Sequence, residues 1–393
     1  MLRVPPLALY VHLPWCVRKC PYCDFNSHAL PAAGIPDRAY LAALLDDLAF
    51  AARGLEGRPV VSVFFGGGTP SLFAADAIGA VLRRTRELLP TSPDLEVTLE
   101  ANPGTIEHGA FTAYRDAGVN RVSLGAQSFD DRHLVALGRI HSHGEIEAAV
   151  AEVRAAGLEN FNLDLMYGLP RQTLDEAVAD VERAIDLAPA HISHYQLALE
   201  PGTAFERRPP QLPDDDVIFA MQGECQRLLA EAGFGQYEVS AYAREGRQCR
   251  HNLNYWRFGD YMGIGAGAHG KTTNAVTGEV MRTERVKQPG LFMSASRAEQ
   301  RVSASRVVAG SDLAFEFFLN ALRLNEGIEP ALFEERTNLA FDTVSGAIAE
   351  ACGRGLLEWT PDGRCTPTDR GRLFLNDLQA IFLVEQPGDG RRA

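Results

Sequence analysis

The sequence predicts an α/β fold, a partial (β/α)6 barrel similar to a TIM barrel, followed by a smaller C-terminal α+β domain. Apolar segments rich in β-branched and aromatic residues recur through the first half of the chain, at residues 7–13, 60–65, 95–101, 121–127, 160–168 and 191–199. Between them lie segments with helical periodicity, at 37–53, 71–89, 106–117, 144–156 and 173–187. Strands that alternate with helices favour right-handed βαβ units and a mainly parallel sheet.

Local signals at the ends of the predicted helices support these assignments. Thr173 is followed by Glu176 at the spacing of a capping box, which indicates a helix start. Gly118 and Gly157 follow two other helical segments, where a glycine can end a helix in the left-handed conformation.

Residues able to carry chemistry stand where the predicted strands end. A run of three glycines at 66–68 follows one strand, and Glu100, Gln127 and Asp164 stand at the ends of three others. Active sites of α/β barrels occupy the C-terminal ends of the strands. We therefore expect these residues to meet at one mouth of the barrel.

The second half of the chain has a different pattern. Residues 200–216 are rich in proline and charge, which predicts a long loop, and a helix follows at 216–233. Helices at 312–324 and 343–354 then precede two short apolar runs around an Asp-Gly turn. This order resembles a winged helix, so we predict a barrel over residues 1–235 and a C-terminal domain over 236–393 that ends in a winged-helix-like module for packing or docking.

Composition excludes several classes of protein. The 393 residues are 46% hydrophobic and carry a formal net charge of -13, which disfavours binding to nucleic acid. The apolar runs are far shorter than the ~20 residues that span a bilayer. The N-terminal residues lack the pattern of a signal peptide. We therefore expect a cytoplasmic protein that is not an integral membrane protein.

Three of the seven cysteines, Cys16, Cys20 and Cys23, fall within eight residues, in the pattern C-x3-C-x2-C. Thiolates at this spacing predict a [4Fe–4S] cluster, and three ligands leave one iron open. One alternative is a zinc site completed by His12 or His28. Another is three unconnected buried thiols, which the polar residues between the cysteines disfavour.

The segment CVRKCPYCDF resembles the cluster-binding loop of radical S-adenosylmethionine (SAM) enzymes, including the aromatic Tyr22 before the last cysteine. In that family the open iron binds the amino and carboxylate groups of SAM, and an electron passed to the sulfonium yields a 5'-deoxyadenosyl radical. The resemblance thus implies a [4Fe–4S] cluster and SAM as cofactors, with the radical chemistry supplied by the cofactor and its orientation by the protein.

The resemblance extends over residues 7–270 to the oxygen-independent coproporphyrinogen III oxidase family. Alone, the glycine run fits a tight strand-to-helix turn, and Glu100 fits a surface carboxylate. The resemblance instead implies that a set of side chains and backbone positions contacts SAM: Tyr10, Tyr22, Gly67, Gly68, Thr69, Glu100, Gln127, Arg139 and Asp164. Charged and amide groups suit a zwitterionic ligand that carries a ribose.

A motif H-N-x-x-Y-W contributes His251, Tyr255 and Trp256. A histidine can ligate haem iron, and aromatic side chains can pack on a macrocycle. By itself such a histidine is more often a packed core residue. The motif resembles that of the haem-chaperone branch of the family, which implies haem as a ligand and His251 rather than His269 as the haem-associated residue. Cys249 is a further candidate ligand, although a buried thiol is its simpler interpretation.

Two functions compete within the family. A haem chaperone would bind haem and transfer it to acceptor proteins, which include respiratory or membrane-associated ones. The alternative is an oxidase that decarboxylates the propionates of coproporphyrinogen III, or another radical SAM enzyme that acts on a porphyrin-type substrate. The oxidases carry a further cysteine where this chain has Phe25, and an N-terminal extension where only nine residues precede Tyr10. We therefore expect a chaperone, and the sequence leaves enzymatic turnover open.

A third class, a winged-helix regulator that senses redox state, rests only on the C-terminal pattern. The oligomeric state is expected to be a monomer or a cluster-dependent dimer, since Trp15 and Phe25 beside the cysteines could form an interface.

Overall fold

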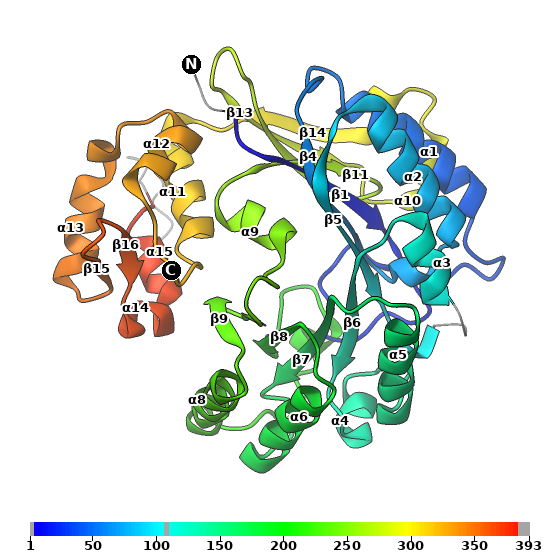
Figure 1. The fold of residues 1–393 in the computed structure, drawn as a ribbon, viewed down its shortest axis with the longest axis horizontal. Helices are drawn as coiled ribbons and strands as arrows, with labels where there is room; N and C mark the ends of the chain where they lie inside the picture. The colour runs from blue at the N-terminus through cyan, green and yellow to red at the C-terminus, as the bar shows by residue number, and fades with distance from the viewer. Residues whose placement is uncertain (1–3, 106–109, 384–393) are drawn as a thin grey trace.

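The computed structural model describes residues 4–105 and 110–383, and its centre is a twisted sheet surrounded by helices (Figure 1). Among the described residues this sheet has twelve strands, in the order β14-β13-β12-β11-β1-β4-β5-β6-β7-β8-β10-β9. Neighbouring strands from β11 to β8 run parallel, and the strands at both edges run antiparallel. The parallel part is the partial barrel that the sequence predicts.

All six predicted strands are present in the parallel part. In four of them the side chains are almost entirely buried, as expected for strands covered on both faces, whereas the third strand is exposed near its start and the sixth at its end. The strands are β1 (Leu7–Leu13), β4 (Val60–Gly67), β5 (Thr91–Ala101), β6 (Arg121–Gln127), β7 (Phe161–Tyr167) and β8 (His191–Gln196).

The predicted helices lie between these strands and cover the outside of the barrel (Figure 1). Thr173 and Glu176 form the expected capping box. Gly118 and Gly157 have φ values of 114° and 75°, in the region that favours glycine. The predicted helices are α1 (Asp37–Ala51), α2 (Ala75–Leu88), α3 (Ala110–Ala117), α5 (His143–Ala155) and α6 (Leu174–Asp186), and the short helix α4 (Asp131–Ala136) before α5 was not predicted.

The first residues of two predicted helices are not part of the helices that the structure describes. The helix expected from residue 71 begins at Ala75, because Pro70–Leu72 form a separate 3-10 turn, η1, directly after the glycine run. The helix expected from residue 106 begins, within the described residues, at Ala110, and its first four predicted positions lie outside them.

The sheet continues beyond residue 236 on both of its edges. On one edge β9 (Gly235–Glu238) and β10 (Ala241–Ala243) extend the sheet beyond β8. On the other edge a strand pairs parallel to β1 and three antiparallel strands follow it. The sequence reading did not predict this second extension, which comprises β11 (Asp260–Ile264), β12 (His269–Thr273), β13 (Val280–Arg285) and β14 (Val302–Val307).

The loop predicted at 200–216 contains one short helix, α7 (Ala204–Arg207), and the helix after it is α8 (Asp215–Glu231). Another helix, α9 (Arg250–Trp256), connects β10 to β11 and packs against β1 and β4. Because α9 carries the H-N-x-x-Y-W motif, this packing brings the motif close to the first two strands of the barrel.

The C-terminal segment forms a separate group of helices with an apolar core of its own, around Phe317, Phe318 and Phe333 (Figure 1). It contains the helix, helix and hairpin that the sequence predicts, with one additional helix between the first two. Its elements are α11 (Gly310–Ala321), α12 (Pro330–Thr337), α13 (Ser345–Gly353), β15 (Leu357–Trp359), β16 (Cys365–Pro367), α14 (Asp369–Leu373) and α15 (Leu375–Ala380).

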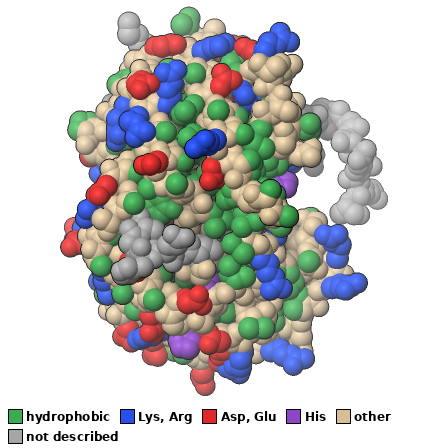
Figure 2. Space-filling model, turned by 90° about the vertical axis from the view of Figure 1, so that its right-hand side faces the viewer, with side chains coloured by type: hydrophobic (Ala, Val, Ile, Leu, Met, Phe, Trp, Pro, Cys, Tyr) green, Lys and Arg blue, Asp and Glu red, His purple; other side chains and the backbone are tan. Residues whose placement is uncertain are grey.

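The surface carries charged side chains of both signs (Figure 2). On the face shown in Figure 2, basic and acidic side chains are interspersed over most of the surface and form no continuous basic band. Within residues 4–105 and 110–383, no helix combines the length and apolar character that crossing a bilayer requires.

Candidate functional site

The cysteine loop connects β1 to α1 and presents three partly exposed thiols, those of Cys16, Cys20 and Cys23. Backbone bonds fold the loop, among them one from the amide of Cys23 to the carbonyl of Cys20 at 3.2 Å. The ammonium of Lys19 donates to the carbonyls of Phe25 and Ser27 at 2.9 and 3.3 Å. The loop is therefore shaped by main-chain contacts, and the thiols stay available as ligands.

The arrangement favours a cluster over a single zinc ion. A zinc ion with Zn–S bonds of about 2.3 Å would hold its tetrahedral sulfurs about 3.8 Å apart. Among the described residues, the cysteines do not form a group whose ligand atoms all lie within 4.8 Å of one another. His12, one proposed fourth ligand, has both ring nitrogens engaged, with the hydroxyl of Tyr10 at 3.0 Å and the carbonyl of Asn26 at 2.9 Å.

The glycine run forms a cradle at the end of β4. A Cβ at Gly67 would lie 2.5 Å from the His12 ring, and one at Gly68 would lie 2.5 Å from the carbonyl oxygen of Trp15. Gly67 also has a φ of +114°, which favours glycine. Both positions therefore need glycine for the backbone to pass this closely beside the cysteine loop.

Glu100 reaches this cradle from β5. Its Oε2 accepts a hydrogen bond from the amide of Gly67 at 3.2 Å. Burial and, to a smaller extent, the nearby Asp164 carboxylate together raise the pKa of Glu100 to about 8. A cationic group bound here would restore the charged carboxylate, which is the behaviour expected of a residue that binds an ammonium.

Arg139 and Gln127 carry polar atoms that are buried without a partner in the described structure. Arg139 donates to the carbonyl of Gly125 at 2.7 Å and lies 3.8 Å from the Cys20 sulfur, but its Nε has no acceptor. Gln127 has a φ of +66°, and its Oε1 has no donor. Buried polar atoms without partners are uncommon, and strained backbone concentrates at functional sites.

Asp164 lies on β7 beside these residues. It accepts hydrogen bonds from Ser123 at 3.1 Å and from Asn162 at 2.8 Å. Burial raises the pKa of Asp164, which also faces Glu100. The strand ends thus gather at one mouth, as expected from the order of the motifs.

The residues present fit the cofactors that the cysteine motif implies. Three thiols stand on one loop, and Gly67 at the end of β4 borders the cavity described below. A guanidinium nitrogen and an amide oxygen remain unpartnered at the same strand ends. This donor set suits an iron–sulfur cluster and a ligand that carries ammonium, carboxylate and hydroxyl groups.

The remaining predicted SAM contacts lie around this site. Tyr10 borders the cavity described below. Thr69 is buried, and its amide donates to Trp15 at 2.8 Å. Tyr22 packs its ring against Phe205, 6.4 Å between centroids, in a small apolar cluster beneath the loop.

Trp15 and Phe25, the two residues expected at an interface, differ in solvent exposure. Trp15 is only 3% exposed and packs edge-on against Tyr40, so the expectation that it could form an interface is wrong. Phe25 is 59% exposed. The tryptophan is buried because β2 (Trp15–Cys16) turns its side chain into the barrel core.

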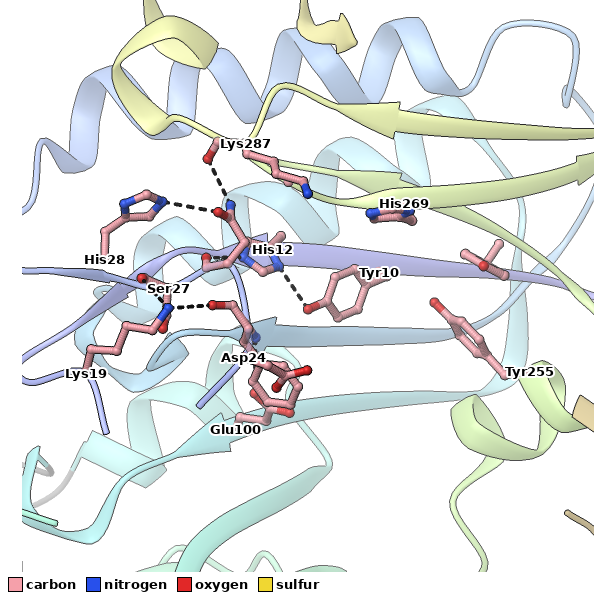
Figure 3. Close-up of a pocket in the computed structure, with 15 residues that line it drawn as sticks. Tyr10, His12, Lys19, Asp24, Ser27, His28, Glu100, Tyr255, His269 and Lys287 are labelled. Atoms are coloured by element: carbon pink, nitrogen blue, oxygen red, sulfur yellow. Dashed lines mark hydrogen bonds between the residues drawn. The ribbon is translucent and has the colours of Figure 1, made fainter. Parts of the chain in front are cut away.

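A cavity of about 590 Å³ opens beside the cysteine loop (Figure 3). One wall consists of residues from the parallel strands and the cysteine loop, including Tyr10, Gly67 and Glu100. We call it the cofactor wall. The other wall comes from α9, β11, β12 and the segment after β13, and we call it the second wall. Its residues are Tyr255, Tyr261, His269 and Lys287.

His251 does not line this cavity. It is 3% exposed, its Nδ1 forms a 2.9 Å hydrogen bond with the hydroxyl of Ser62, and its Nε2 has no partner. Its ring packs between Phe64 and Tyr255, with centroids 5.0 and 5.1 Å away. Burial lowers the pKa of His251 to about 3, so the ring is neutral.

The other residues of the motif take different positions. Tyr255 borders the cavity and stacks on Tyr261 with ring centroids 4.1 Å apart. Trp256 instead faces the C-terminal segment, where the Arg323 guanidinium lies 4.3 Å from its ring centroid. The structure therefore brings one of the three predicted haem residues, Tyr255, to the cavity.

Sequence reasoning missed a residue that positions α9. Glu96 on β5 accepts hydrogen bonds from the amides of Arg250 and His251 at 3.1 and 3.0 Å, and contacts the Cys249 sulfur at 3.6 Å. Because Glu96 lies in a different strand, no local motif connects it to the helix. Cys249 is fully buried in this contact, as its simpler interpretation required.

Family models of known proteins match segments in both halves of the chain. Residues 10–184 match the family model of the Radical SAM superfamily, and residues 308–374 match that of the HemN C-terminal domain. The curated relatives include proteins named "Heme chaperone HemW". That of Escherichia coli (strain K12) is 48% identical over 98% of this chain and 100% of its own length. That of Haemophilus influenzae is 46% identical, with 98% and 100% covered.

A solved structure has the same fold. Coproporphyrinogen III oxidase (HemN) from Escherichia coli, a radical SAM enzyme, superposes with a TM-score of 0.80 at 22% identity, covering 98% of this chain and 91% of that one. This likeness establishes the architecture of a partial barrel with a C-terminal module.

Proposed function

The chain belongs to the HemW family of radical SAM proteins, and we propose that it is a haem chaperone, which binds haem beside a SAM-ligated [4Fe–4S] cluster and transfers haem to acceptor proteins. The similarity to proteins of that name extends over nearly the whole chain, so it includes the cysteine loop, the motif on α9 and the C-terminal module.

The observation that carries the proposal is the cavity between the two walls. Its volume of about 590 Å³ lies in the range typical of cofactor sites. It joins the cysteine loop to the aromatic side chains of Tyr255 and Tyr261. A flat macrocycle bound on the second wall would thus lie beside the cluster.

The radical SAM domain implies a [4Fe–4S] cluster and SAM. When bound, they supply an electron and a source of the 5'-deoxyadenosyl radical. In our proposal Cys16, Cys20 and Cys23 hold the cluster. Glu100 accepts the ammonium of SAM, and Arg139 pairs with its carboxylate. Four further side chains and a backbone segment complete the pocket for the rest of the molecule: Tyr10, Tyr22, Gln127, Asp164 and the backbone from Gly67 to Thr69.

We assign the haem side of the cavity to α9 and its neighbours. Tyr255 would contact the macrocycle directly, since it borders the cavity. His251 and Trp256 would act on haem binding by holding α9 in place. The side chain of His251 is buried, and that of Trp256 packs on Arg323.

The partners of the proposed function are haem and haem-acceptor proteins, respiratory or membrane-associated ones among them. The proposed location is the cytoplasm. The winged-helix-like module, which has its own core, is the part of the chain that we propose for docking an acceptor.

A paired titration tests the proposal. Anaerobically reconstituted protein is titrated with haem and with SAM, while the haem spectrum and 5'-deoxyadenosine formation are recorded together. We expect saturable binding of about one haem per chain. The same preparation is then incubated with coproporphyrinogen III, SAM and a reductant, and we expect no protoporphyrinogen IX. Conversion of the porphyrinogen, or haem binding that does not saturate, would overturn the proposal.

A further inference from the structure

His269 differs from His251 in being open to the cavity. It is the first residue of β12, its side chain is exposed, and it lines the cavity of 590 Å³ (Figure 3). Among the described residues its imidazole has no hydrogen-bond or ion-pair partner. A neutral imidazole with a free ring nitrogen is a common ligand of haem iron.

His251 cannot offer the same ligand in this structure. Its Nδ1 is engaged by Ser62, and the rings of Phe64 and Tyr255 cover it on two sides. The rings of Tyr255 and Tyr10 lie 5.1 and 6.5 Å from the His251 ring, measured between centroids. The tyrosines themselves line the cavity, so the histidine lies behind the surface that a ligand would contact.

His269 also stands where two hollows meet. A second cavity of about 440 Å³ lies on its other side, against β13, β14 and α11. Among the described residues, His269 lines both cavities and no other residue does. A large ligand bound at this imidazole therefore has space in both directions.

The surroundings suit a dicarboxylate macrocycle. Tyr255 and Tyr261 stack at 4.1 Å beside His269 and supply an apolar surface. In the second cavity Arg282 and Arg306 already pair with Glu316, at 2.7 and 3.0 Å. The ammonium of Lys287, in contrast, has no partner among the described residues, and it can pair with a carboxylate.

We propose that His269 is an axial ligand of the haem iron and that Lys287 binds a haem propionate. The inference rests on the proposed function and makes it more specific. An imidazole nitrogen donates a lone pair to iron, and no electron is transferred. The macrocycle then lies along the second wall, and the cofactor wall remains available for SAM.

The test compares three single variants of the reconstituted full-length protein by haem titration. His269→Gly should lower haem affinity at least tenfold and change the Soret band. Free imidazole added to this variant should restore the wild-type spectrum, because it replaces the missing ligand. His251→Ala should keep the wild-type ligation spectrum. The third variant, His143→Ala, removes an exposed histidine at the start of α5 that pairs with Asp131 of α4. It should behave as wild type.

Lys287→Gln provides an independent test. It should weaken haem binding several-fold without changing the spectrum. The difference from wild type should disappear with haem dimethyl ester, which lacks free carboxylates. Thermal unfolding of each variant checks the fold.

The outcomes separate the two proposals. Wild-type protein that fails to bind haem saturably would overturn the proposed function itself. Wild-type binding of one haem per chain, with an unchanged spectrum and affinity in His269→Gly, would overturn only the assignment of the ligand. Loss of the ligation spectrum in His251→Ala alone would transfer that assignment to His251.

Discussion

The two walls of the cavity are built differently. The cofactor wall comes from parallel strands and the loops at their ends, and it is defined by backbone: the glycine cradle, the bonds that fold the cysteine loop and the strained Gln127. The second wall comes from a short helix and an antiparallel edge of the sheet, and it is defined by side chains. These are two stacked tyrosines, and an imidazole and an ammonium that have no hydrogen-bond partner among the described residues.

This difference separates two kinds of recognition. Backbone that approaches within contact distance tolerates few residue types, so the cofactor wall suits one invariant ligand. Side chains on an exposed edge can be exchanged without disturbing the fold. We infer that the cofactor wall fixes the radical SAM cofactors, while the second wall determines which macrocycle the protein takes.

Removal of a cysteine has the largest expected effect. Cys20→Ala should reduce cluster iron and sulfide to near zero after anaerobic reconstitution, because two thiolates cannot retain the cluster. Haem affinity should remain close to wild type if the two walls act separately. Cys352→Ala, a partly buried cysteine in the C-terminal segment, is the control. Loss of haem together with the cluster would show that the walls form one unit.

The cofactor wall should also give the cofactor-free protein a dependence of stability on pH. Folded Glu100 keeps its proton up to a pKa of about 8, whereas the unfolded chain releases it near 4.5. Between these values the folded state binds more protons, so its free energy of unfolding falls as pH rises. The Glu100 contribution is present below the lower value and is lost through the upper one.

Urea unfolding of wild type and Glu100→Gln between pH 5 and 8 measures this contribution. The difference in slope should approach about 1.4 kcal/mol per pH unit. Parallel pH profiles for the two proteins would refute the burial of this carboxyl group in an uncharged form.

The glycine cradle predicts a smaller effect on stability. Gly67→Ala introduces a Cβ 2.5 Å from the His12 ring at a φ of +114°. It should cost about 1–3 kcal/mol in the free energy of unfolding and weaken SAM binding at least tenfold. Gly54→Ala has a positive φ of +77° with no atom within 4 Å, so it reports the backbone cost alone. Equal SAM affinity in both variants would exclude the cradle as part of the cofactor wall.

On the second wall, Glu96→Gln should have the smallest effect of the series. It weakens the charge-assisted bonds to the amides of Arg250 and His251, at a cost of about 1–2 kcal/mol. Because α9 carries Tyr255, haem binding should weaken while SAM binding stays unchanged. Asp94→Asn removes the exposed ion pair at the same helix end and should change little. An equal loss of SAM affinity would show that the walls are coupled through β5.

The two walls also differ in how well sequence predicts them. The strands of the cofactor wall are continuous apolar runs, and its cysteines and glycines form local motifs, so both the fold and the site were predictable. The antiparallel edge of the sheet that continues from the second wall lacks such runs, because β14 is almost entirely exposed and β12 begins with the exposed His269. No local pattern distinguishes such strands from loops.

Long-range contacts explain the remaining differences. The interpretation of His251 came from its motif, but its burial depends on Ser62 and Phe64, which lie nearly two hundred residues earlier in the chain. The support of α9 by Glu96 likewise connects residues far apart in sequence. Trp15 was expected at an interface because it lies beside the cysteines in a loop predicted to be partly exposed, yet Tyr40 on α1 packs against it.

The most direct test of this account is an iron anomalous difference map from crystals of reconstituted, haem-loaded protein. We expect two separate iron positions, the cluster at Cys16, Cys20 and Cys23 and a single iron within bonding distance of the His269 imidazole, with the macrocycle against Tyr255 and Tyr261. A haem iron on His251, or outside the cavity, would contradict the assignment of haem to the second wall.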